Sequence, residues 1–346
     1  MELLDTTVRD GSYAVDFKFT CEDVKDIVVK SETIGFKYIE IGHGLGLNAS
    51  NKEHGVALHT DKEYIRAARE VVKDAKLGCF CIPGIATLED LRRAKDDGLS
   101  FVRIGVSALR PEDAKEYVIE AKKLGYIVMV NFMKTYVISP EQFGANVKVV
   151  EAYGADYVYI VDSAGCMLPE DIRKYYEAVR KNSDIKVGFH GHDNIGLAVS
   201  NSVYCAELGM DMIDCSFQGL GRSSGNASTE KVIMTMMKKG ILKDVDIPRT
   251  LEYGYAALRN IVPKKLEHPL DLMCGYAGFH SGFLKDIYRC CVKNKVDPLR
   301  LILAYSEIDK VGMDFDKLCA VSKKLPVDIE RNPYGFNDFF SEIFND

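Results

Sequence analysis

The sequence lacks the features of a membrane-spanning or exported protein. No segment approaches the run of about 20 apolar residues that is needed to cross a bilayer. The N-terminal segment MELLDTTVRDG does not contain the charged stretch followed by an apolar one that marks a signal peptide. These absences predict a cytoplasmic protein that does not act at a membrane.

Concentrated positive charge is also missing. The formal net charge is −6, and the basic side chains are scattered, with only short runs such as Lys264-Lys265. Proteins that bind nucleic acid need a basic surface to neutralise phosphates. Nucleic acid is therefore not an expected partner.

The ten cysteines do not form two well-spaced CxxC pairs. Several lie in apolar segments, such as Cys79 and Cys81 in LGCFCIPG, which is typical of buried free thiols in a reducing compartment. A zinc site built on these two thiols would need further ligands for which the sequence offers no candidates.

The chain does contain a regular alternation of strand-like and helix-like segments over roughly its first 240 residues. The expected strands are short β-branched or aromatic segments at residues 3–7, 38–42, 77–82, 101–106, 127–132, 157–162, 186–192 and 212–217. Many of the intervening helix-like segments end in glycine, which is typical of a helix C-cap. Eight such units with continuously apolar strands predict a closed (β/α)8 TIM barrel. An open doubly wound sheet is disfavoured because the turn after the first strand, RDGSYA, is not GxGxxG.

The pattern changes after residue 245, where helix-like segments continue without strand partners. We therefore expect two domains, a barrel at residues 1–245 and a small helical C-terminal domain at residues 246–346. Within the second domain, HPLDLMCGYAGFHSGFLKDIYRCC is expected to form one kinked helix interrupted by glycine. An apolar helical appendage on a barrel predicts a homodimer.

The strand ends carry a candidate metal site. The active site of a TIM barrel lies at the C-terminal ends of its strands. His190 and His192 are two residues apart on the seventh strand and so point to the same face. Asp10 follows the first strand, which lies beside the last strands in a closed barrel. This mixed nitrogen and oxygen set suits Mn²⁺, Co²⁺, Zn²⁺ or Fe²⁺ better than Ca²⁺; the alternative is two ordinary hydrogen-bonded histidines near a loop.

Other polar residues at the strand ends admit two interpretations each. Arg9 forms either a simple ion pair or a donor for a carboxylate or enolate oxygen of a substrate. Ser163 belongs either to a helix N-cap or to a substrate contact. The loop GLGRSSGNAS, which contains Arg222 and Asn226, either holds an anion or is only a tight connection that glycine permits.

Several motifs together resemble a known family. DTTVRDG, FHGHDNIGLAVSN and GLGRSSGNAS occur in the order found in the DRE-TIM metallolyase (HMGL-like) superfamily, which includes isopropylmalate synthases, hydroxymethylglutaryl-CoA lyases and 4-hydroxy-2-oxovalerate aldolases. IGHGLGLNASN, ALHTDKEYI and GYAGFHSGFL resemble the aldolases in particular. The resemblance covers nearly the whole chain, and it implies a carbon–carbon lyase that cleaves or forms a 4-hydroxy-2-oxo acid from pyruvate and an aldehyde.

The resemblance also implies roles for individual residues. The metal, Mn²⁺ or else Co²⁺, Mg²⁺ or Zn²⁺, would be held by Asp10, His190 and His192. It would bind the carboxylate and 2-oxo oxygens of the substrate, and Arg9 would add positive charge beside the oxygen that becomes negative. A base would remove the proton of the 4-hydroxyl group. Further substrate contacts are expected from Ser163, Asn226 and His43.

The sequence departs from the aldolase pattern at the base. The aldolases have a histidine, thought to be that base, two positions after the glycine of RDG, and this chain has Tyr13 there. Conversely, a tyrosine of the aldolase segment GYAG-x-Tyr-SSF is replaced by His280. We expect His280 to supply the imidazole and Tyr13 to be its hydrogen-bonding partner, because a tyrosine with an ordinary pKa of about 10 is a poor base at neutral pH. His43 and His59 are further candidates, and the alternative is that His280 is structural and the activity has diverged.

Aldolases of this kind pass their aldehyde to an acylating aldehyde dehydrogenase that docks through the C-terminal domain, so such an enzyme is an expected partner. Two other functions stay open: acyl-CoA Claisen-type synthesis or cleavage, and a catalytically diverged barrel that serves as a subunit. The sequence shows no additional regulatory domain and no cysteine within residues 219–225, which favours the aldolase over acyl-CoA chemistry. The intact metal set argues against a diverged barrel.

Overall fold

The computed structural model describes all residues except 263–267, 280, 310–311 and 328–346. The chain divides into two compact units, residues Met1–Val245 and Asp246–Asp346. Each unit is described by itself below. Among the described helices, none combines the length and apolar character that a membrane span requires.

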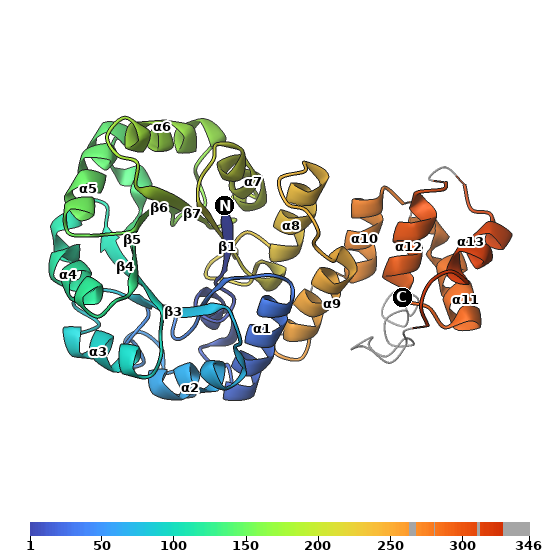
Figure 1. Ribbon diagram of the computed structural model, residues 1–346, viewed down its shortest axis with the longest axis horizontal. Helices are drawn as coiled ribbons and strands as arrows, with labels where there is room; N and C mark the ends of the chain where they lie inside the picture. The colour runs from blue at the N-terminus through green and yellow to red at the C-terminus, as the bar shows by residue number, and fades with distance from the viewer. Residues whose placement is uncertain (263–267, 280, 310–311, 328–346) are drawn as a thin grey trace. The chain divides into compact units, whose positions relative to one another are not determined.

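Eight parallel strands of the first unit close into a barrel (Figure 1). The strands are β1 (Glu2–Asp5), β2 (Tyr38–Glu40), β3 (Lys76–Cys81), β4 (Phe101–Ser107), β5 (Ile127–Met133), β6 (Tyr157–Asp162), β7 (Lys186–Gly191) and β8 (Met212–Cys215). Each strand pairs with the next in sequence, and β8 pairs with β1 to close the ring. The predicted TIM barrel is thereby confirmed.

Eight α-helices alternate with the strands and lie outside the ring in Figure 1. They are α1 (Cys21–Thr33), α2 (Asp61–Val71), α3 (Leu88–Asp96), α4 (Lys115–Lys123), α5 (Pro140–Ala152), α6 (Pro169–Arg180), α7 (Ala198–Glu207) and α8 (Thr229–Lys238). The first three start with a threonine whose side chain accepts a hydrogen bond from the backbone three residues later, at Thr20, Thr60 and Thr87. In each case an acidic side chain three residues later accepts a hydrogen bond from the threonine backbone N–H, which completes a capping box. Local sequence therefore determines where these helices begin.

The interior of the barrel is filled in layers. A buried cluster from six strands begins at the strand starts and reaches Val161 near the end of β6; it consists of Leu4, Tyr38, Phe101, Met129, Tyr157, Tyr159, Val161 and Met212. Inward positions recur every second residue of a strand. Two residues after Tyr38, Phe101 and Met212 the inward side chains are therefore charged, and this layer supports the candidate site.

The second unit is helical. It contains α9 (Ile247–Leu258), α10 (Pro269–Ala277), α11 (Leu284–Asn294), α12 (Pro298–Ser306) and α13 (Phe315–Ser322). Our prediction of a single kinked helix is wrong. α10 is capped at its C-terminal end by Gly278, which has a positive φ of 65°, and α11 begins only after a short 3-10 turn. Glycine ends the helix because it adopts the left-handed conformation without steric cost.

The connection between β2 and α2 forms one wall of the barrel mouth. Its turn is fixed by hydrogen bonds from the Gly46 N–H to the His43 carbonyl (2.7 Å) and from the Leu47 N–H to the Phe80 carbonyl (2.9 Å). Gly46 has a φ of 90°, and a Cβ atom there would lie 2.0 Å from the Phe80 carbonyl oxygen. Only glycine fits this position, because a side chain would meet both backbone strain and a rigid backbone atom.

We predict that Gly46→Ala destabilises the barrel far more than Gly84→Ala. Gly84 has a similar φ of 92°, but a Cβ atom there meets nothing within 4 Å. Gly84→Ala should therefore cost only the strain of the left-handed conformation, about 1–2 kcal/mol, whereas Gly46→Ala adds a steric clash worth about 1–3 kcal/mol more. Urea unfolding followed by circular dichroism measures both, and equal losses would show that the Phe80 carbonyl yields without cost.

Candidate active site

Three buried side chains converge at the C-terminal ends of the strands. Asp10, His190 and His192 present ligand atoms that all lie within 4.8 Å of one another, and no other such group of His, Cys, Asp or Glu occurs among the described residues. Asp10 begins a short 3-10 helix after β1, His190 lies on β7, and His192 follows that strand. The structure thus brings together the three residues that we expected to bind a metal.

The donor set fits a divalent cation. Asp10 Oδ2 is buried and has no hydrogen-bond partner among the described residues. It lies 4.0 Å from His190 Nε2 and 3.9 Å from His192 Nδ1. Ligand atoms that share one ion at bonds of about 2.0–2.2 Å are up to about 4 Å apart. A buried carboxylate oxygen without a donor is costly, and a cation between these atoms would remove that cost.

The protonation states also suit a metal. Burial alone would raise the pKa of the Asp10 carboxyl, but Arg9 and the two histidines outweigh it and hold the pKa well below its usual range. Burial lowers the pKa of His192 to about 4. At neutral pH the aspartate is therefore ionised and His192 is neutral, which are the forms that coordinate metals.

A buried charge network holds the metal-binding residues from below. Arg103 on β4 is completely buried and donates to Glu40 Oε2 (2.8 Å) and to Asp214 Oδ2 (2.5 Å). Because these partners lie on β2 and β8, the three side chains meet inside the barrel. Asp214 also contacts His190 Nδ1 at 2.8 Å, so that Nε2 of the same ring is directed toward Asp10. A carboxylate on the distal nitrogen is the usual way in which a protein orients a histidine ligand.

Arg9 connects this network to the metal-binding carboxylate. Its Nε donates to Glu40 Oε2 (2.8 Å) and its Nη1 donates to Asp10 Oδ1 (2.7 Å). Its Nη2 makes no hydrogen bond within the described part of the chain. The two interpretations of Arg9 are thus compatible, since the guanidinium group is ion-paired and still has N–H groups to offer a ligand.

The metal-binding residues line a cavity of about 80 Å³ at the barrel mouth. Of the residues singled out in the sequence, those that line it are Arg9, Asp10, Tyr13, Ser163, His190, His192 and Arg222, and Asn131 lines it as well. Ser163 accepts a hydrogen bond from the Lys134 backbone N–H (2.9 Å). The rest of the wall is mainly apolar and is formed by Leu45, Phe80, Ile82, Met133 and Val161.

His43 and Asn226 do not line this cavity. Both ring nitrogens of His43 are engaged by the backbone, since Nδ1 accepts from the Leu45 N–H (3.2 Å) and Nε2 lies 3.1 Å from the Gly55 carbonyl. The ring is stacked on Phe17 with a centroid distance of 4.2 Å. Asn226 donates to the Leu220 carbonyl (3.2 Å), and its side chain also helps to lower the pKa of the Asp10 carboxyl. These contacts support the loops around the site.

His59 and His280 complete the predicted set. His59 lies edge-on to the ring of Tyr64, with centroids 5.6 Å apart, and does not line the cavity. His280, the expected base, lies outside the described residues.

Tyr13 occupies the place where the family pattern has a histidine. Burial raises the pKa of Tyr13 above its ordinary value, so its hydroxyl is protonated at neutral pH. The hydroxyl has no hydrogen-bond partner among the described residues, and it faces a cavity in which both imidazoles belong to the metal set. Tyr13 can therefore donate a proton but cannot accept one readily.

Sequence reasoning missed Arg103 and Asp214. The signal was present, because each is a charged residue within an apolar strand, in FVRIGV and MIDCSF respectively. Each also stands two positions after a core residue, which places it on the inward face.

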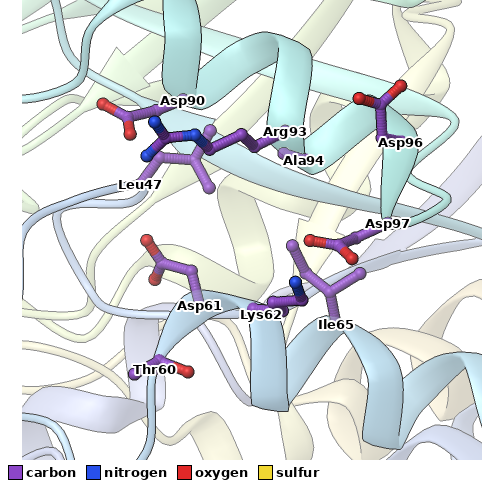
Figure 2. Close-up of a pocket in the computed structure, with 10 residues that line it drawn as sticks. All are labelled: Leu47, Thr60, Asp61, Lys62, Ile65, Asp90, Arg93, Ala94, Asp96 and Asp97. Atoms are coloured by element: carbon purple, nitrogen blue, oxygen red, sulfur yellow. The ribbon is translucent and has the colours of Figure 1, made fainter.

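A larger hollow lies elsewhere on the barrel, between α2 and α3. It measures about 570 Å³, and Figure 2 shows the carboxylates of Asp61, Asp90 and Asp97 around it. Two of these have structural roles: Asp61 accepts from the Asn48 N–H (2.7 Å), and Asp90 caps α3. The smaller cavity, which holds the metal-type ligands, is therefore the candidate active site.

Comparisons with known proteins show what the chain is similar to. The HMGL-like family model matches residues 1–255. The chain is 35% identical over 326 residues to a 4-hydroxy-2-oxovalerate aldolase from Moorella thermoacetica, which covers 94% of this chain and 96% of that protein. It is 39% identical over 280 residues to an oxaloacetate decarboxylase from Mycobacterium tuberculosis, which covers 81% and 83% of the two chains. The fold matches that of the HMG-CoA lyase from Bacillus subtilis, with a TM-score of 0.66 at 19% identity over 76% of this chain and 95% of the other.

We predict that Asp214→Asn weakens metal binding about 10- to 100-fold, the usual effect of removing a carboxylate that orients a histidine ligand. The substitution keeps the shape of the side chain but removes the charge that faces both His190 and Arg103. Titration of the metal-free protein with Mn²⁺, followed calorimetrically, measures the change.

Asp211→Asn is the matched control. Asp211 precedes β8 and accepts from the Val187 N–H (2.9 Å), away from the site. It should leave the affinity for Mn²⁺ unchanged. An Asp214→Asn variant that folds and binds Mn²⁺ as tightly as the unaltered protein would show that Asp214 does not determine the metal affinity.

Proposed function

Because the chain belongs to the HMGL-like family, we propose that it is a divalent-metal-dependent aldolase that cleaves or forms a 4-hydroxy-2-oxo acid. The products of cleavage are pyruvate and an aldehyde. The observation that carries the proposal is the buried set of Asp10, His190 and His192, in which Asp10 Oδ2 is unpaired beside the Arg9 guanidinium. Mn²⁺ is the proposed ion, with Co²⁺, Mg²⁺ and Zn²⁺ as alternatives.

The reaction separates the C3–C4 bond of the substrate. A base takes the 4-hydroxyl proton, C4 leaves as the aldehyde, and the electron pair passes through C3 and C2 to the 2-oxo oxygen, which gives the enolate of pyruvate. When bound, a divalent ion supplies Lewis-acid stabilisation of that developing charge. Arg9 adds to it through Nη2, because a charged donor fixed in place before the reaction needs no reorganisation.

Among the described residues of the cavity, each candidate for the base that accepts the 4-hydroxyl proton already has another role. His190 is bonded to Asp214, His192 and Asp10 belong to the metal set, and Tyr13 is protonated. We infer that His280 is the base, with Tyr13 as the proton donor or hydrogen-bonding partner. The support is chemical: the chain has a histidine in the segment where the aldolases have a tyrosine, and the reverse at position 13.

The C-terminal unit supports two further parts of the proposal. The aldolase relative from M. thermoacetica aligns over 94% of this chain, so the alignment extends beyond the barrel. We propose that residues 246–346 provide the docking surface for an acylating aldehyde dehydrogenase and for a homodimer, with the aldehyde as the molecule passed on. We also place the protein in the cytoplasm.

Acyl-CoA chemistry has weaker support. The likeness to HMG-CoA lyase is at 19% identity and concerns the fold alone, whereas the aldolase relatives exceed 30% identity over most of the chain. A barrel without catalysis is disfavoured by the buried metal set, for which packing alone gives no reason.

Decarboxylation of an oxaloacetate-type acid is the second candidate reaction. It breaks the same C3–C4 bond, and CO₂ leaves with no proton to remove, so the reaction needs no base and only a proton donor for C3 of the enolate. The protonated Tyr13 in the cavity favours it. The relative named oxaloacetate decarboxylase adds support at 39% identity.

We predict that the protein releases pyruvate from 4-hydroxy-2-oxo acids in the presence of Mn²⁺ and loses this activity in EDTA. The metal is needed because no other group would stabilise the full charge on the 2-oxo oxygen. Coupling to lactate dehydrogenase measures the rate for several chain lengths, with oxaloacetate tested in parallel. Metal-independent release, or no pyruvate from any of these acids with Mn²⁺ demonstrably bound, would refute the proposal.

We predict that His280→Ala lowers kcat for aldol cleavage by at least about 100-fold, the usual contribution of a general base, while the Mn²⁺ affinity stays within about twofold. His54→Ala, which removes a histidine of the β2–α2 connection outside the cavity, is the control. If the substituted enzyme keeps its full rate, His280 is not the base. Loss of aldol cleavage with retained oxaloacetate decarboxylation would show that only aldol cleavage requires His280, as expected because decarboxylation needs no base.

A further inference from the structure

Arg222 places a positive charge at the mouth of the cavity. Its side chain lines the cavity together with the metal-binding residues, and its guanidinium carbon lies 6.0 Å from the ring centroid of Tyr13. Its single hydrogen bond among the described residues is a long one of 3.5 Å to the Ser163 carbonyl. No carboxylate within the described part of the chain pairs with it, in contrast to the two buried arginines below it.

The loop that carries Arg222 is fixed in place. The Gly225 N–H donates to the Arg222 carbonyl (3.0 Å), and the Asp193 N–H donates to the Gly225 carbonyl (3.0 Å). Ser223 accepts from the Asn194 side chain (2.7 Å). These bonds fix the backbone from which the exposed Arg222 side chain extends to the cavity, so less of the loop has to be ordered when a ligand binds.

The positive charge of Arg222 is not balanced by the charges of the buried network around the cavity. The buried network contains two arginines, Arg9 and Arg103, and three carboxylates, Asp10, Glu40 and Asp214. It therefore carries one net negative charge, which a divalent ion would turn into one net positive charge. One carboxylate of a 2-oxo acid balances this. Arg222 adds a second positive charge, for which a substrate with a single carboxylate has no partner.

We propose that Arg222 binds a second carboxylate of the substrate, so that the preferred substrates are 2-oxo acids whose chain beyond C3 ends in a carboxylate. Tyr13, whose ring lies beside the Arg222 guanidinium, lines the same part of the cavity. This assignment rests on the proposed function, because it assumes that the metal holds the 2-oxo acid end. The second carboxylate could belong to a fragment that leaves as CO₂ or to an aldehyde fragment that retains it.

The test uses two unreactive ligands that differ only at the distal end. 2-Oxoglutarate has the second carboxylate, and 2-oxopentanoate has a methyl group there; neither has a 4-hydroxyl group or a 3-carboxylate to react. With Mn²⁺ bound, calorimetry should find 2-oxoglutarate about three- to tenfold tighter, as expected for a charged pair at an exposed rim. The preference should shrink as the ionic strength rises.

Substitutions assign the preference to the residue. Arg222→Gln should reduce the ratio of the two dissociation constants to near one, and Arg222→Lys should retain part of it. Arg173→Gln removes the same charge from the exposed surface of α6 and should leave the ratio unchanged. Equal binding of both ligands by the unaltered protein, or an unchanged ratio in Arg222→Gln, would overturn the role of Arg222 alone. Binding of neither ligand while Mn²⁺ is bound would overturn it together with the proposed function, in which the metal holds the 2-oxo acid end.

Turnover then identifies the source of the second carboxylate. Faster metal-dependent pyruvate release from 4-hydroxy-2-oxoglutarate than from 4-hydroxy-2-oxopentanoate would support a carboxylate that stays on the aldehyde. A preference for oxaloacetate over both would support one that leaves as CO₂. A preference for the monoanionic 4-hydroxy-2-oxopentanoate over both dianions would overturn the proposal.

Discussion

The buried ion-pair network centred on Arg103 is the interaction on which the rest of the site depends. A guanidinium group with no exposure to water is stable only where carboxylates surround it, because removing one partner of a buried pair costs about 3–5 kcal/mol. Glu40 and Asp214 supply these carboxylates from β2 and β8, the two strands that flank β1. Each of them then has a second partner nearer the mouth, Arg9 and His190 respectively, so the network that neutralises Arg103 also positions the groups that would hold the metal.

Along the barrel axis, the residues that stabilise the fold lie in other layers than the residues proposed to act on a substrate. The lowest layer is apolar and contains residues such as Phe101 and Met212, the middle layer is charged and paired through Arg103, and the top layer has unpaired atoms. Asp10 Oδ2 is a buried oxygen of the top layer without a hydrogen-bond partner among the described residues, and Glu40 Oε1 and Asp214 Oδ1 are further such oxygens in the layer below. A protein leaves buried polar atoms unsatisfied only at some cost, and at this depth the cost would be offset when a cation and an anionic substrate bind.

The presence of Tyr13 limits the reactions that the described residues of the cavity can support by themselves. Cleavage of an aldol needs a proton acceptor, whereas loss of CO₂ needs none, and both pass through the same enolate. Tyr13 offers a proton and no base, so the described cavity by itself is equipped for the second half of either reaction. In the proposed function, the first half then depends on His280 as the base and on the group that Arg222 binds.

The sequence by itself determined the barrel and the metal set. The alternation of eight apolar strands with capped helices was enough for the fold, and the spacing of His190 and His192 placed both on one face. Two features depended on contacts that no local pattern encodes. His43 is an expected substrate contact, and the structure shows that Gly55 and Leu45 engage both of its ring nitrogens. Arg103 and Asp214 are 111 residues apart and meet only because the barrel closes. Periodicity tells which way a side chain points, but its partners across the barrel are decided by the closure that brings distant strands around one axis.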